Sequence, residues 1–165
     1  MKFLIILAAF VTLAYAEHVC TDRAKFLEYR AVCASANGVT DEQIEHLKQY
    51  QFDLENESVY CHVKCIFEKM DLFKDGTFVT DNVLHQLHHG TKDLDDAAVR
   101  ADLDSCVEEF KAEEDKCKFA FNVLKCFNGK NDKNLGYLKS SFVAHTEGEH
   151  EHAHVHDHAH AHHHH

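Results

Sequence analysis

The stretch Ser58 to Met70, S-V-Y-C-H-V-K-C-I-F-E-K-M, places two cysteines four residues apart on a segment with helical periodicity. A helix turns by about 100° per residue, so Cys61 and Cys65 face almost the same way. An apolar stripe beside them is formed by Val59, Val63, Phe67 and Met70. Two sulfurs in adjacent turns of one helix are poorly placed to bond each other, so we expect each to reach a different neighbouring element. This helix is therefore predicted to be the hub of the fold.

The rest of the chain is divided by helix start and stop signals. Capping residues and apolar periodicity predict a helix at about 23–35, a short helix that begins at the capping box Thr40-Asp41-Glu42-Gln43, and helices at about 58–70, 81–89, 93–111 and 114–127. Thr80 is predicted to cap the fourth of these helices, and Asn128-Gly129 to end the last. Lys74-Asp75-Gly76 is predicted to form a turn. The chain has no proline and only six glycines, so the fold class is predicted to be all-α.

The two ends of the chain differ from this helical part. Residues 1–16, M-K-F-L-I-I-L-A-A-F-V-T-L-A-Y-A, are typical of a secretory signal peptide cut after Ala16, and the alternative is a buried N-terminal helix. No later apolar run approaches the roughly 20 residues of a membrane span. Residues 17–144 are predicted to form one helical domain, and an apolar segment at 135–143 is expected to fold back on it. Residues 145–165 are predicted to be a disordered, histidine-rich tail.

Charge and cysteine content restrict the partners and the compartment. The formal net charge of −11 argues against nucleic acid or an anionic membrane as the main partner. All seven cysteines follow the predicted signal peptide, and an oxidising secretory route would let them pair. An odd count leaves one cysteine unpaired, and the six others allow fifteen connectivities, among which spacing alone does not choose.

Six cysteines carry a resemblance to a known family. The gaps between Cys33, Cys61, Cys65, Cys106, Cys117 and Cys126 contain 27, 3, 40, 10 and 8 residues. This series resembles the six-cysteine signature of the insect odorant-binding proteins of the pheromone and general odorant-binding type. The resemblance implies a compact fold of six helices around an apolar cavity, with disulfides Cys33 to Cys65, Cys61 to Cys117 and Cys106 to Cys126. Cys20 and the histidine tail lie outside the pattern.

The function that the resemblance implies is a secreted carrier, without a catalytic step. It would bind and solubilise small hydrophobic ligands of the odorant, pheromone, fatty acid or terpenoid type in extracellular fluid, and a chemosensory receptor is a candidate partner. Each aromatic or aliphatic candidate, taken alone, is also accounted for by core packing. The candidate ligand-binding residues are Phe26, Leu27, Val63, Phe67, Met70, Phe73, Phe78, Leu84, Leu87, His88, Phe110, Phe121, Leu124, Tyr137 and Phe142.

The histidine tail supports an alternative function in metal binding or metal buffering. Alternating His-X-His residues in an extended chain can close on Zn²⁺, Cu²⁺ or Ni²⁺, so the candidate metal ligands are His154, His156, His158, His160 and His162. The same segment is compatible with a solubilising tail or with part of a purification tag. Apart from the tail, no cofactor is expected, because no motif places a nucleophile, base or metal cluster in the helical part. The chain is expected to be a monomer or a weak homodimer, which Cys20 could link.

Overall fold

The computed structural model of the chain describes residues 20–143, and side chains as far as residue 139. The predicted signal peptide and the histidine tail lie outside this range. The all-α class is confirmed, and the helices of the described part are α1 (Arg23–Asn37), α2 (Asp41–Lys48), α3 (Glu57–Lys69), α4 (Thr80–Gly90), α5 (Asp96–Phe110), α6 (Lys116–Lys130) and α7 (Asp132–Val143). The apolar C-terminal segment thus forms most of a helix, α7.

Local hydrogen bonds explain where the first helices begin and end. The Asp22 side chain accepts a hydrogen bond from the backbone N–H of Lys25 at 2.8 Å and caps α1, and Gly38 ends α1 with a φ of 65°. A residue with positive φ favours glycine, because other side chains clash with the backbone there. The predicted capping box at Thr40 and Gln43 is present at the start of α2.

Two predicted helix signals are wrong. Val79, not Thr80, is the N-cap of α4, and it makes no side-chain cap hydrogen bond. Helix α6 does not stop at Asn128-Gly129 but continues to Lys130. The last turn of α6 is held by tertiary contacts, since Asn134 of α7 donates a hydrogen bond to the carbonyl of Phe127 at 3.1 Å. Contacts of this kind outweigh the low helix propensity of a single glycine, which costs about 1 kcal/mol.

The predicted turn at 74–76 lies within a small hairpin. Strands β1 (Phe73–Lys74) and β2 (Thr77–Phe78) pair antiparallel, with Phe73 opposite Phe78. Asp75 and Gly76 both have positive φ, at 53° and 81°, which is the backbone conformation of the tight two-residue hairpin turn. The rings of Phe73 and Phe78 lie 5.2 Å apart, and Phe67 of α3 packs on Phe78 at 5.5 Å. The hairpin therefore packs against the hub helix α3 through aromatic rings.

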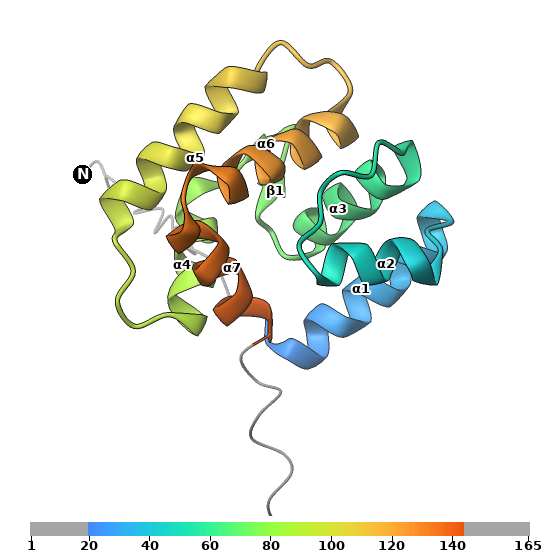
Figure 1. The fold of residues 1–165 in the computed structure, drawn as a ribbon, viewed down its shortest axis with the longest axis horizontal. Coiled ribbons are helices and arrows are strands. Elements are labelled where there is room, and N and C mark those ends of the chain that lie inside the picture. Colours follow the sequence, from blue (N-terminus) through green and yellow to red (C-terminus); the bar gives the residue numbers. More distant parts are fainter. Residues whose placement is uncertain (1–19, 144–165) are drawn as a thin grey trace, which may run out of the picture.

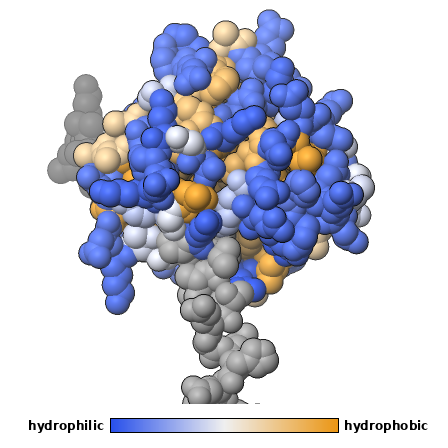
Figure 2. Space-filling model, viewed as in Figure 1, coloured by the Kyte–Doolittle hydropathy of each residue, from blue (hydrophilic) through white to orange (hydrophobic). Residues whose placement is uncertain are grey.

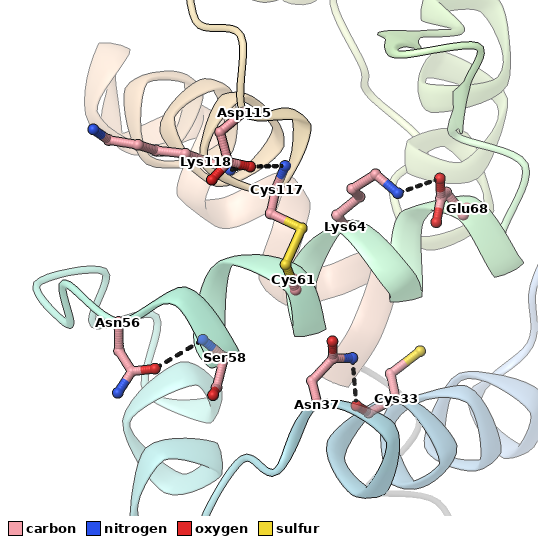
Figure 3. Close-up of a disulfide and its surroundings, with 10 residues drawn as sticks. All are labelled: Cys33, Asn37, Asn56, Ser58, Cys61, Lys64, Glu68, Asp115, Cys117 and Lys118. Atoms are coloured by element: carbon pink, nitrogen blue, oxygen red, sulfur yellow. Dashed lines mark hydrogen bonds and ion pairs between the residues drawn. A yellow bond between two sulfur atoms is a disulfide. The ribbon is translucent and has the colours of Figure 1, made fainter.

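Helix α3 packs against α1 and α6, as expected of a hub. In Figure 1, α1 and α2 lie on one side of the molecule, α4 and α5 lie on the other, and α6 and α7 lie between them. Cys65 of α3 is bonded to Cys33 of α1, and Cys61 is bonded to Cys117 of α6. Figure 3 shows the second of these bonds between the two helices. A third bond joins Cys106 of α5 to Cys126 of α6. These are the three pairs that the resemblance implies.

The N-terminal end of the described chain is attached to α4 by side-chain hydrogen bonds. Gln86, 1% exposed, accepts a hydrogen bond from the backbone N–H of Thr21 at 2.8 Å and donates one to its carbonyl at 3.0 Å. Cys20 is the free cysteine of the described part, and its thiol donates to the carbonyl of His85 at 3.4 Å. Burial raises the pKa of this thiol. The residues just before α1 are therefore attached to α4.

The apolar residues of the described part are mostly inside. The face in Figure 2 is largely hydrophilic, and hydrophobic residues show only between the hydrophilic ones. Within the described residues, Val32 is the large hydrophobic side chain that stands out as exposed, at 48%. The main core lies between the α4–α5 side and α6, and its largest buried members are Phe73, Leu84, Leu87, Leu103, Phe119, Phe127 and Leu138.

Candidate ligand-binding site

A cavity of about 390 Å³ lies between α1, α2 and α3 and reaches α6 and α7. Its wall is mainly apolar, with a few polar and charged groups. The lining residues are Arg23, Phe26, Leu27, Arg30, Ile44, Leu47, Lys48, Tyr50, Phe52, His62, Val63, Ile66, Phe67, Leu124 and Leu138. Pockets for small ligands are mostly apolar hollows of roughly 300–1,000 Å³ with a few placed polar groups. The size and the lining both fall in that class.

Helix α1 turns one continuous face toward the cavity. Arg23, Phe26, Leu27 and Arg30 are spaced i, i+3, i+4 and i+7, so they form a single stripe along the helix. Cys33 is the buried residue of α1, whereas Phe26 and Leu27 remain half-buried. Phe26 also packs against the core cluster around Cys33 and Ile66, so this face of α1 borders both the cavity and the core.

Helix α2 shows the same behaviour. It has an apolar side, formed by Ile44 and Leu47, yet no residue of α2 is buried. Both side chains line the cavity. On the opposite wall, α3 contributes the buried residues Val63 and Ile66. The cavity is therefore bounded by two half-covered helices on one side and by the hub helix on the other.

Tyr50 connects the wall of the cavity to α7. It lies after α2 with a φ of 57°, a backbone conformation that residues other than glycine rarely adopt. Its hydroxyl donates a hydrogen bond to the carbonyl of Leu138 at 3.3 Å. Burial raises the pKa of Tyr50 to about 12, so the phenol keeps its proton at neutral pH and remains a donor. A partly buried hydrogen bond thus links this part of the cavity wall to the C-terminal helix.

A second, smaller hollow of about 40 Å³ continues the space toward α4 and α5. Phe67, Leu124 and Leu138 line both the cavity and this hollow, so they separate the two. The hollow is also lined by the buried residues Leu72, Gln86, Leu87, Leu103, Val123 and Phe127. Near Phe67 the cavity wall is therefore apolar, and the side chains of Phe67, Leu124 and Leu138 separate the cavity from the smaller hollow.

His62 is the most deeply buried polar residue of the cavity wall, with 1% of its surface exposed. Its Nδ1 atom has no hydrogen-bond partner within the described part of the chain. Burial lowers the pKa of His62, a hydrogen bond with the backbone of Cys33 opposes this, and the nearby charge of Arg30 lowers the pKa further. His62 is therefore neutral in the folded protein near neutral pH.

The lowered pKa of His62 predicts a loss of stability in mild acid. Below the ordinary pKa of 6.5 the unfolded chain takes up a proton that the folded chain does not, so the free energy of unfolding falls until the pH reaches the lower folded pKa. In His62→Gln this contribution is absent. We expect the variant to lose less stability than the parent protein between about pH 7.5 and about pH 5.5 in urea unfolding. His88→Gln, at an exposed histidine, is the control; an equal pH dependence in parent and His62→Gln would contradict the prediction.

Comparison with known proteins gives the family of the chain. Residues 16–130 match the PBP/GOBP family. The chain belongs to this family. It is also similar to odorant-binding protein 22 of Aedes aegypti, at 35% identity over 143 residues that cover 86% of this chain and 97% of the relative. General odorant-binding protein 99a of Drosophila melanogaster is 26% identical over 132 residues, 79% of this chain and 92% of the relative.

The PBP/GOBP family is a family of small-ligand carriers, and the match agrees with the resemblance that the cysteine spacing indicates. A third relative, general odorant-binding protein 56a of Drosophila melanogaster, is 32% identical over 129 residues, which are 76% of this chain and 89% of the relative. Within the described residues, no three histidine, cysteine or acidic side chains are placed to hold a metal ion. None of the described helices has both the length and the apolar character of a membrane span.

The candidate residues of this PBP/GOBP chain fall into three groups. Those that line the cavity are Phe26, Leu27, Val63, Phe67 and Leu124. Phe78 and Leu87 line the smaller hollow. Those placed in the cores, lining neither space, are Met70, Phe73, Leu84, Phe110, Phe121 and Tyr137. Spacing in the sequence indicates that a side chain points inward, but it does not distinguish a core position from a lining position.

The last two candidates are His88 and Phe142. His88 is exposed and does not line the cavity, and its Nε2 lies 2.8 Å from a carboxylate oxygen of Asp96. Phe142 belongs to α7, but its side chain lies outside the described part of the structure. The candidate tail ligands, His154 to His162, also lie outside it.

Several lining residues are not among the candidates that the sequence provides. Periodicity places Ile44 and Leu47 on one side of a short helix but does not assign them to the pocket. Arg23, Arg30 and His62 are charged or polar, so an apolar pattern does not identify them as wall residues. A signal is present for the arginines, because they continue the stripe of Phe26 and Leu27 by one turn in each direction. His62 shares the buried face of α3 with Val59, Val63 and Ile66.

Proposed function

We propose that this protein is a secreted carrier that binds one small hydrophobic ligand in the cavity between α1, α2 and α3. The observation that carries the proposal is the cavity of about 390 Å³ with its mainly apolar wall. A hollow of this size loses the dispersion contacts that a filled core would make. Three disulfides that join α1, α3, α5 and α6 can offset that loss.

Two further features support the proposal. One favours a carrier over an enzyme, and the other favours secretion over an intracellular location. The relatives are named odorant-binding proteins, and they match along 92% or more of their length in two cases. Residues 1–16 have the charge and apolar pattern of a signal peptide, and three disulfides suit an oxidising compartment.

We expect the intact mass of protein recovered from the medium of expressing insect cells to match a chain that begins at Glu17. Retention of residues 1–16 would contradict secretion by this route.

Filling the cavity should abolish ligand binding. Leu27→Trp places a large ring on the half-buried wall of α1, and we expect the fluorescent apolar probe N-phenylnaphthylamine to lose its affinity for the protein by about tenfold or more. Val32→Trp is the matched control, because Val32 lies on the same helix, is 48% exposed and does not line the cavity. The measurement is a fluorescence titration, with circular dichroism to show that both variants are folded.

The outcome of this comparison is decisive for the cavity. Probe binding to the parent protein and to Val32→Trp, with loss in Leu27→Trp, supports the proposal. Absence of binding to the parent protein, or equal binding to all three, would show that the hollow does not hold a guest.

A second candidate function is metal binding by the histidine-rich tail. Residues 145–165 contain eleven of the seventeen histidines, and His154, His156, His158, His160 and His162 alternate with other residues. Imidazole suits Zn²⁺, Cu²⁺ and Ni²⁺. Calorimetric titration of Zn²⁺ into the full chain and into a chain ending at Ala144 tests this function. Equal heats from both proteins would exclude the tail as the metal site.

A further inference from the structure

A sequence pattern for N-linked glycosylation lies at the start of the hub helix α3. Residues 56–58 read Asn-Glu-Ser, which fits the pattern Asn-X-Ser/Thr, with X other than proline, that is modified on asparagine in secreted proteins. The whole chain contains this pattern once, because no other asparagine has a serine or threonine two positions later. A pattern of three residues also arises by chance, so the place of Asn56 in the structure decides whether a glycan can be attached there.

Asn56 is exposed, in the connection between α2 and α3. Its charged neighbours Asp53, Glu55 and Glu57 are exposed as well. Phe52, which precedes them, lines the cavity, whereas no residue from 53 to 58 does. A glycan is bulky and needs a position on the surface. On Asn56 it would extend into solvent and leave the cavity open.

The two ends of the Asn56 amide have different roles. Its Oδ1 accepts a hydrogen bond from the backbone N–H of Ser58 at 2.8 Å and caps α3, as Figure 3 shows. Its Nδ2 donates no hydrogen bond to any of the described residues. Glycosylation replaces one hydrogen of Nδ2 and leaves Oδ1 able to accept. The cap, which at such positions contributes about 1 kcal/mol, is therefore compatible with a glycan on the same side chain.

The order of synthesis also leaves Asn56 accessible. Helix α3 packs on α6, and Cys61 is bonded to Cys117, which follows it by 56 residues. Asn56 therefore enters the secretory pathway before the helix that holds α3 has been made. An isolated helix of 13 residues is marginal in water. Residues 56–58 are thus not yet locked into the folded helix when a glycosyltransferase of the pathway meets them.

From this pattern and this placement we infer that Asn56 carries an N-linked oligosaccharide in the secreted protein. The inference rests on the proposed secretion, because the transfer takes place inside the secretory pathway. The donor is an oligosaccharide linked to a lipid through pyrophosphate. Nδ2 of Asn56 forms a bond to C1 of the first sugar and loses one proton. The bond between C1 and the pyrophosphate oxygen breaks, and the lipid pyrophosphate leaves with the electron pair.

The test uses the full chain secreted by insect cells. We expect the parent protein to be heavier than its polypeptide, and to shift to a lower apparent mass on a denaturing gel after treatment with peptide-N-glycosidase A. Mass spectrometry of the peptide that contains residue 56 should show the sugar on that peptide. The mass expected for a chain from Glu17 is that of the polypeptide, so it is measured after this treatment.

Two substitutions at Ser58 separate the glycan from the helix cap. Ser58→Ala breaks the pattern but keeps the backbone N–H that donates to Asn56, so we expect the shift to be lost while α3 stays capped. Ser58→Thr keeps the pattern and should keep the shift. Ser35→Ala is the matched control, because Ser35 is an exposed serine of α1 with no asparagine two positions before it, and it should keep the shift.

Glycosylation and secretion fail in different ways. If the secreted parent protein has the mass of the bare chain from Glu17, or if Ser58→Ala keeps the shift, the glycan on Asn56 is overturned while secretion stands. If Ser35→Ala loses the shift as Ser58→Ala does, the assignment to Asn56 is also contradicted. If the chain stays in the cells and keeps residues 1–16, secretion by this route is overturned, and the glycan with it.

Discussion

Replacing Cys61 and Cys117 together by alanine is expected to lower the free energy of unfolding by about 4 kcal/mol, out of roughly 5–15 kcal/mol for a domain of this size. The bond closes a loop between positions 56 residues apart, the widest separation of the three disulfides. In the chain-entropy treatment, removing it frees the unfolded chain most. Both cysteines are half-buried, so alanine leaves little empty volume at either position.

Urea unfolding of the double variant measures this loss, and the thermal midpoint should fall on the order of 15 °C. Cys20→Ser is the control, because Cys20 belongs to no disulfide. Neither Cys61 nor Cys117 lines the cavity, so the folded double variant should still bind the apolar probe. A loss of less than about 1 kcal/mol would show that the packing of α3 on α6, and not the bond, holds the two helices together.

Phe121→Ala is expected to lower the free energy of unfolding by about 3–5 kcal/mol. Phe121 is 2% exposed on α6, and its ring lies 4.7 Å from that of Tyr60 and 6.0 Å from that of Phe52. Removing the ring leaves a hole that rigid neighbours close only in part. Because Phe121 packs in a core cluster and does not line the cavity, probe affinity should change far less than stability.

Phe26→Ala provides the opposite case. Phe26 is half-buried on the cavity wall, so its removal should cost less stability than that of Phe121 and change probe affinity more. Urea unfolding and probe titration of the two variants measure both quantities. If Phe121→Ala weakened the probe more than Phe26→Ala did, the boundary between core and cavity described above would be wrong.

Much of the fold follows from local signals in the sequence. The capping box at Thr40 and the glycine at position 38 fix helix ends through hydrogen bonds within a few residues, and such bonds form in any context. The signals fail at Gly129, where Asn134 from the next helix satisfies the backbone of α6. Local chemistry thus predicts an end correctly only where no distant residue supplies the missing hydrogen bonds.

The candidate site is predictable only in part. Helical phase correctly places Phe26, Leu27 and Val63 on inner faces, and it places Phe121 and Met70 there as well. Phase specifies the direction of a side chain but not what fills the space in front of it. For Phe121 that space is filled by Phe52 and Tyr60, whereas for Phe26 it is open.

By itself, the sequence determined most of the helices, the all-α class and the family, because caps, periodicity and cysteine spacing are local or one-dimensional properties. The tertiary structure decided which inner faces meet a cavity, that His62 is buried with an Nδ1 lacking a partner in the described part, and that Arg23 and Arg30 line a wall without carboxylates among its described residues. These facts depend on the separation between helices that are distant in the chain. That separation is set by the packing of α1 and α6 against α3, which no single segment encodes.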